Sequence, residues 1–154
     1  MGITIHYSGQ LRDARMLGAL IDSTREYSSR NNWGFALIPH AIDNLQGFVV
    51  HPHPECEPLE FRFGKRNRFA SFVKTQFAGP EIHIQVVRLL RAIKPILGRL
   101  GVHDEGEYWE TENEETLRWH INKVNELIES YKTENPGIQI RVKTPDGRII
   151  DILE

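Results

Sequence analysis

Two histidines and a cysteine lie close together in the sequence, in the run His51-Pro52-His53-Pro54-Glu55-Cys56. Imidazole and thiolate groups are the preferred ligands of zinc in proteins. In an extended segment His51 and His53 would point to the same side, because side chains alternate along a strand. The prolines favour instead a rigid loop whose histidines face water. A metal site would need further ligands from distant parts of the chain, and the candidates are His83 and His103.

A second group of candidates lies where a predicted strand meets a predicted helix. Lys74 and Gln76 belong to a β-prone segment, and Glu81 and His83 follow Gly79-Pro80, a pair that predicts a helix start. Polar groups at such a junction often line a pocket, which makes Lys74, Gln76 and Glu81 candidate ligand-binding residues. The alternative is that Glu81 only complements the helix dipole while His83 faces solvent.

The third candidate segment, 102–109, places His103 beside two carboxylates, Asp104 and Glu105, and two aromatic residues, Tyr108 and Trp109. Such a loop could hold a divalent cation or cover a ligand that contacts Tyr108 and Trp109. In a metal-dependent hydrolase, Asp104 or Glu105 would be the general base that activates a metal-bound water. However, acidic residues continue to Glu115 without any Lys or Arg, which is more typical of a solvated acidic surface.

The segment 62–74 has the opposite charge, since it contains no acidic residue. Its basic patch consists of Arg62, Lys65, Arg66 and Arg68. Phenylalanines alternate with these charges, a composition typical of surfaces that bind single-stranded nucleic acid. The alternation predicts that the phenylalanines point into the core. A net charge of −2 for the whole chain gives little long-range attraction for a polyanion, so the sequence favours the chain's own acidic segment or an acidic protein as the partner.

Hydrophobic periodicity and turn residues predict the elements that position these candidates. Helical spacing predicts a helix at 11–27, after a break at Ser8-Gly9, a second from Pro80 to about residue 100, and a third that starts with a capping box at 111–114. Pro95 would kink the second helix near Arg91 or end it at Lys94. Alternation and turn signals predict strands at 2–7, 33–38, 47–51, 59–63 and 69–77, and a hairpin at 138–153.

The order of these elements predicts an α+β fold, with a largely antiparallel sheet, about three helices packed on one face, and a C-terminal β-hairpin. A length of 154 residues fits one globular domain, 1–154. A single cysteine, Cys56, cannot form an internal disulfide, which predicts a cytoplasmic protein. No apolar run is long enough for a membrane span.

The sequence contains no complete catalytic motif, and this absence favours a noncatalytic binding or accessory domain that contacts a protein partner through its charged loops. No cofactor is predicted on this interpretation. One alternative is the hydrolase, with zinc or another divalent cation bound by His51, His53, His83 and His103. A second alternative is weak binding of a nucleic acid or an acidic partner at 62–74, with nucleic acid the less favoured of the two. The edge of the C-terminal hairpin could also pair with a second copy of the chain.

Overall fold

Strand β1 (Thr4–Leu11) lies at the centre of the fold. The computed structural model describes residues 2–39 and 46–152, and in it β1 pairs on one side with β5 (Arg68–Lys74) and on the other with β6 (Leu97–Asp104). Both pairings are antiparallel, so β5 and β6 run parallel to each other. Helix α2 (Pro80–Ile93) connects them. The three elements therefore form a split β-α-β unit around β1.

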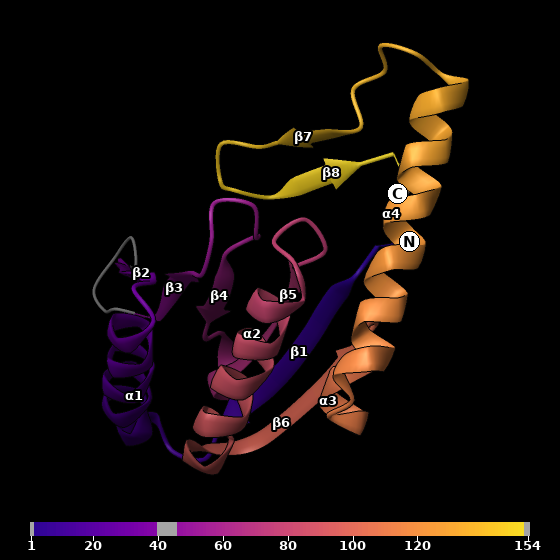
Figure 1. Ribbon diagram of the computed structural model, residues 1–154. Helices are drawn as coiled ribbons and strands as arrows, with labels where there is room; N and C mark the ends of the chain where they lie inside the picture. Colours follow the sequence, from indigo (N-terminus) through magenta and orange to yellow (C-terminus); the bar gives the residue numbers. More distant parts are fainter. Residues whose placement is uncertain (1, 40–45, 153–154) are drawn as a thin grey trace.

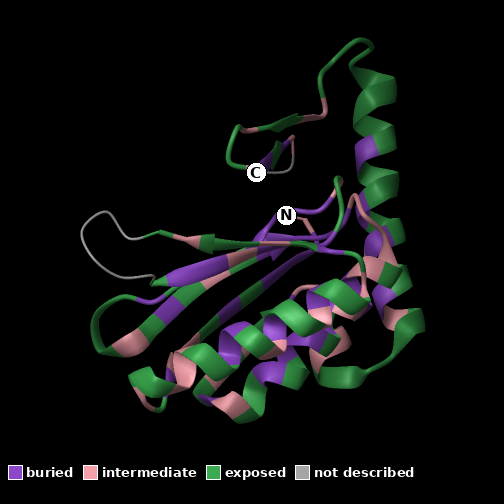
Figure 2. Cartoon of the chain, turned by 90° about the vertical axis from the view of Figure 1, so that its left-hand side faces the viewer, coloured by how far each residue is buried: buried purple, intermediate pink, exposed green. Residues whose placement is uncertain are grey.

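A second antiparallel sheet continues the first. Its strands are β2 (Gly34–Ile38), β3 (Gly47–His51) and β4 (Leu59–Arg62), and β4 lies beside β5. Helix α1 (Leu17–Arg30) and helix α2 lie on the same side of these strands, as Figures 1 and 2 show. The predicted α+β class and the antiparallel character of the sheet are confirmed.

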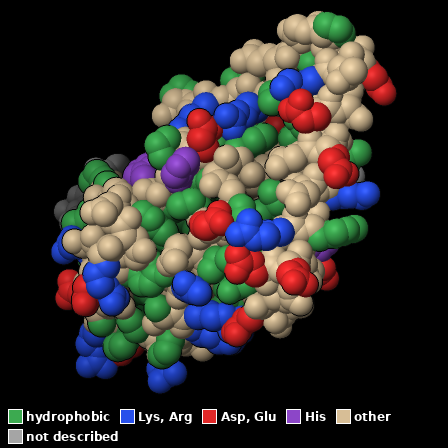
Figure 3. All heavy atoms as spheres, in the orientation of Figure 1, with side chains coloured by type: hydrophobic (Ala, Val, Ile, Leu, Met, Phe, Trp, Pro, Cys, Tyr) green, Lys and Arg blue, Asp and Glu red, His purple; other side chains and the backbone are tan. Residues whose placement is uncertain are grey.

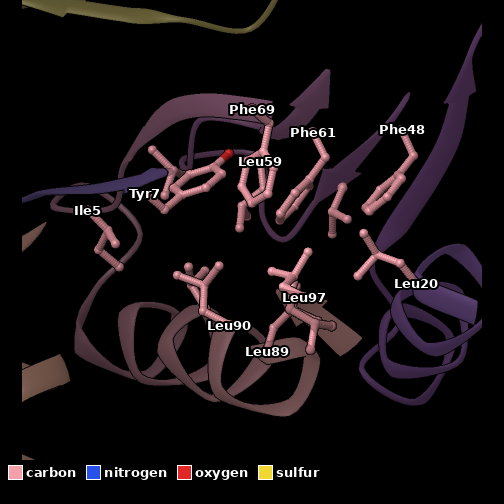
Figure 4. Close-up of a cluster of buried hydrophobic side chains, with 14 of the residues drawn as sticks. Ile5, Tyr7, Leu20, Phe48, Leu59, Phe61, Phe69, Leu89, Leu90 and Leu97 are labelled. Atoms are coloured by element: carbon pink, nitrogen blue, oxygen red, sulfur yellow. The ribbon is translucent and has the colours of Figure 1, made fainter. Parts of the chain in front are cut away.

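The main core fills the space between the sheet and these two helices. Its sheet side is a row of rings from neighbouring strands, Tyr7, Phe69, Phe61 and Phe48, which face leucines of the helices (Figure 4). The odd-numbered residues of β1 point into this layer, because Ile5 and Tyr7 are buried whereas His6 and Ser8 are exposed. The opposite face of the central strands is consequently open to solvent.

Helix α4 (Glu114–Glu134) lies alongside this body, after the single turn α3 (Tyr108–Thr111). A separate apolar cluster of Ile3, Ile84, Leu117, Ile121, Val124 and Ile128 attaches it. The third helix was predicted correctly, but its predicted capping box is wrong. The Asn113 side chain is the N-cap and accepts a hydrogen bond from the Thr116 N–H.

The predicted C-terminal hairpin is confirmed as β7 (Arg141–Lys143) and β8 (Ile149–Asp151). It lies over the end of the sheet where β5 finishes (Figure 1). The attachment is polar and buried. Lys74 Nζ donates to Asp151 at 3.0 Å and to the Ile149 carbonyl, while Glu57 accepts from the N–H groups of Lys74 and Ile149 at 2.8 Å each.

Two predicted boundaries, both at strands, were wrong. Ser8-Gly9 does not break the chain, because β1 continues through it to Leu11, and β5 ends at Lys74, before the predicted end at residue 77. Helix α2 ends at Ile93 and a 3₁₀ turn, Lys94–Ile96, follows, which is one of the two outcomes predicted for Pro95. The following residues, interpreted as helix and loop, form strand β6. No described helix is long and apolar enough to cross a bilayer.

Candidate functional site

The open face of β5, β1 and β6 carries three rows of residues. Each row runs across the three strands at positions that are paired in the register. Strand register places Phe72, His6 and His103 in one row, Ala70, Ser8 and Gly101 in the next, and Arg68, Gln10 and Arg99 in the third. Small residues thus occupy the middle of the face, between an end with rings and an end with arginines. We call these the ring end (Phe72, His6, His103) and the arginine end (Arg68, Arg99 and the neighbouring Arg62).

Two adjoining hollows lie on this open face. One, of about 610 Å³, extends over the arginine end, and the other, of about 460 Å³, over the ring end. They share the small residues Ser8, Ala70 and Gly101 as lining. Both volumes fall in the range of small-molecule and nucleotide sites. The small middle row therefore leaves a continuous depression across the three strands.

The arginine end is positively charged and lacks lining carboxylates. Arg62, Arg68 and Arg99 line its hollow together with uncharged residues only. Arg62 pairs with Glu60 at 3.2 Å, but within the described chain neither Arg68 nor Arg99 forms an ion pair. The helix-covered side differs, since positive and negative side chains are mixed there (Figure 3). Guanidinium groups without a carboxylate partner are well suited to bind phosphate oxygens.

The ring end presents three flat side chains at the surface. The His6 ring is stacked on His103, with centroids 5.8 Å apart and an interplanar angle of 29°, and lies 6.2 Å from Phe72. Phe72 is 43% exposed, so the prediction that all phenylalanines of this segment point into the core is wrong for this one. The Arg148 guanidinium lies 4.4 Å from the Phe72 ring centroid. Exposed rings of this kind can stack with the bases of an unpaired strand.

His83 and Asp104, two of the predicted site residues, form a buried network. The hydroxyl of Thr75 lies 2.7 Å from His83 Nδ1, and His83 Nε2 lies 3.0 Å from Asp104 Oδ2. The side chains of His83 and Asp104 are both 0% exposed. Although the order Thr-His-Asp matches that of a hydrolase triad, no substrate can reach it. The alternative that His83 faces solvent is also wrong.

Asp104 also fixes the chain that follows β6. Its carboxylate accepts from the N–H groups of Gly106 at 2.7 Å and Trp109 at 2.9 Å. Burial by itself would raise the pKa of Asp104, but the hydrogen bond and charge of His83 and the two N–H donors outweigh it and lower that pKa. The network thus stabilises the ionised carboxylate and positions α3, and we assign it a structural role.

The predicted group at the strand-to-helix junction is divided between the interior and the surface. Lys74 and Gln76 are buried and bind the hairpin residue Asp151, at 3.0 and 3.2 Å. Glu81 is exposed and pairs with Arg118 of α4 at 2.7 Å. They form no common pocket, because their side chains hold the hairpin and α4 in place.

The histidines proposed as metal ligands lie apart. His51 and His53 are exposed at the end of β3 and in the following loop, His83 is buried, and His103 is on the open face. Residues 2–39 and 46–152 contain no group of three or more His, Cys, Asp or Glu placed to hold a metal ion. Cys56 is buried, and burial together with the nearby Glu57 charge raises the pKa of its thiol to about 12.

Several carboxylates of the acidic segment have partners, and these partners lie outside the basic patch. Glu105 accepts a hydrogen bond from the Thr4 N–H at 2.9 Å and lies 3.3 Å from His6. Glu107 lies 2.5 Å from His120. Glu112 pairs with Arg91 at 3.4 Å. Tyr108 and Trp109 are half-buried, with Arg91 4.5 Å from the Trp109 ring centroid. Among the described residues, no ion pair joins this segment to Arg62, Lys65, Arg66 or Arg68.

Sequence reasoning missed the β1 residues and Arg99 of the open face, and it named His103 only as a metal ligand. His6 lay within the predicted strand at 2–7 and was not named as a candidate. Arg99 was placed in a helix. Only the pairing of β1 with both β5 and β6 brings them beside Arg68 and Phe72. The available signal was the alternation in 2–7, which puts His6 on the outer face.

We compared the chain with models of known protein families, with curated proteins and with solved structures, and no match was found.

Proposed function

We propose that the chain is a noncatalytic module that binds a short single-stranded nucleic acid on the open face of β5, β1 and β6. One observation carries the proposal: strand register gathers the arginine end and the ring end on one surface, separated by small residues. Phosphates would bind Arg68, Arg99 and Arg62, and bases would stack on Phe72, His6 and His103. The small middle row leaves room for the backbone that connects them.

The open face supports this function better than it supports an acidic protein partner. Carboxylates of an acidic peptide would use the arginine end but would leave the exposed rings without a role. Nucleic acid uses both ends, because each nucleotide offers a charged phosphate and a flat base. A near-neutral chain with a local cluster of arginines also fits moderate, salt-sensitive affinity. Contact with a protein through the charged loops has less support, since two carboxylates of the acidic loop, Glu107 and Glu112, already have partners within the chain.

Fluorescence anisotropy with a labelled oligouridine tests the proposal. A length of about 8 nucleotides is within the usual range for single-strand-binding domains. The Arg68→Gln/Arg99→Gln variant should bind weakly and should lower the slope of log K against log salt by about 1.4, because each phosphate contact contributes about 0.7 for single strands. Phe72→Ala should weaken binding about tenfold through lost stacking. Its exposure of 43% limits the cost to stability.

Arg88→Gln is the matched control, because Arg88 is exposed on α2, on the helix-covered side. This variant should bind like the wild type. Equal affinities of all variants would refute the proposal, as would the absence of measurable binding at low salt. Tight binding of an oligoglutamate, with an affinity that Phe72→Ala does not change, would favour an acidic protein partner instead.

A further inference from the structure

A third hollow, of about 380 Å³, lies at the start of the edge strand β6, and four cationic residues from four parts of the chain line it. They are Arg12, which follows β1, Arg91 at the end of α2, Lys94 in the 3₁₀ turn, and Arg99 on β6. All four are exposed. In the ranges that the structure describes, only Arg91 of these forms an ion pair, with Glu112 at 3.4 Å.

This edge hollow adjoins the open face. Arg99 lines both the edge hollow and the hollow of the arginine end. The end of β1 also lies against the start of β6, because Leu11 is opposite Leu97 and a Cβ added at Gly98 would be 3.1 Å from the Arg12 Cα. Positive side chains therefore line both hollows, with Arg68 in one, Arg12 and Lys94 in the other, and Arg99 in both.

The far side of the edge hollow is held in place by Trp109. The Arg91 guanidinium lies 4.5 Å and the Lys94 ammonium 5.6 Å from the centroid of its ring. Arg91 also donates to the Trp109 carbonyl. The Trp109 N–H is in turn bonded to the buried Asp104. Trp109, which is itself anchored in the interior, thus fixes the positions of two cations that line the edge hollow.

On the basis of the proposed function, we infer that the bound strand leaves the open face at the arginine end, turns around the start of the edge strand β6 and continues into the Arg12–Lys94 hollow. Such a turn over one strand edge requires a flexible ligand. Duplexes resist bending over a few base pairs, because their persistence length is about 150 base pairs. The path therefore selects single strands, and it makes affinity depend on length beyond the part that fills the open face.

A length series of labelled oligouridines, from about 4 to about 16 nucleotides, tests this inference. Wild-type affinity should rise by about tenfold once the oligonucleotide is long enough to reach the edge hollow, because two further phosphates are neutralised. The Arg12→Gln/Lys94→Gln variant should lose this rise but bind the shortest oligonucleotides like the wild type. An RNA duplex of adenosine and uridine strands should compete poorly.

The outcomes separate this inference from the proposed function. If Arg68→Gln/Arg99→Gln weakens the short oligonucleotides but Arg12→Gln/Lys94→Gln binds every length like the wild type, the open face binds the strand and the path around β6 is wrong. Equal competition by the duplex would also overturn the path. If the wild-type protein does not bind short oligonucleotides, both the proposed function and the path around β6 are wrong. Arg88→Gln is again the control for nonspecific loss of charge.

Discussion

At the scale of residues, the buried Asp104 side chain has three hydrogen-bond partners. One of its oxygens accepts from the Gly106 N–H, and the other faces both the Trp109 N–H and His83 Nε2. In Asp104→Asn, either orientation of the amide would place its NH₂ group against a donor. We expect a loss of about 3 kcal/mol in the free energy of unfolding, measured by urea denaturation at neutral pH. Glu112→Gln, at an exposed carboxylate, should cost less than about 1 kcal/mol.

The lowered pKa of Asp104 gives the same network a defined pH dependence. Because this pKa lies below the value in the unfolded chain, about 3.9, the carboxylate stabilises the fold fully above about pH 4. Its contribution disappears as the pH falls through the native pKa. Urea unfolding at a series of pH values should therefore show the difference between wild type and Asp104→Asn shrinking in acid. A difference that stays constant down to about pH 2 would contradict the role assigned to the carboxylate.

At the scale of elements, the buried carboxylate of Glu57 is one of the groups that hold the C-terminal hairpin. Glu57 accepts from the N–H groups of Lys74 and Ile149 and lies 3.3 Å from Arg148. Glu57→Gln should cost about 2 kcal/mol and should let the hairpin open locally. Amide hydrogen exchange in β7 and β8 reports on this opening, and it should be faster in the variant. Glu55→Gln is the matched control, because Glu55 pairs with Arg141 at a partly exposed position. If it changes the exchange rates equally, Glu57 has no special role.

The sequence predicted the type of most elements, and tertiary packing explains the errors. Gly9 was interpreted as a turn residue, yet it lies within β1. Only glycine fits at this position, because a Cβ there would be 2.4 Å from the Arg99 carbonyl oxygen. The apolar spacing of α2 continues in phase through Leu97 and Leu100, so periodicity alone could not separate β6 from the helix. The basic patch was visible as composition. Its partners on the open face were not, since they depend on pairing between strands far apart in the chain.

At the scale of the whole molecule, the order of pairing should determine how the chain folds. The central strand pairs Thr4 with Lys74 and Ile5 with Asp104, so its contacts close long loops. Helices α1 and α2 have 14 residues each, a length that is marginal for an isolated helix. We expect stopped-flow refolding in milliseconds to seconds, with helix ellipticity and Trp33 fluorescence recovering together in a Trp109→Phe/Trp119→Phe background. Helix signal that forms fully within the dead time would contradict this coupling.

The small middle row of the open face has a consequence for engineering. A Cβ added at Gly101 would meet nothing nearer than the Ser8 hydroxyl, at 3.8 Å, so packing does not require glycine at this position. A cysteine placed there would be accessible on the surface, unlike the buried Cys56. A fluorophore attached to it would stand between the two ends of the proposed site, where an incoming strand would change its environment. The same position would accept bulky residues that fill the depression, which offers a way to separate occupancy of the face from stability of the fold.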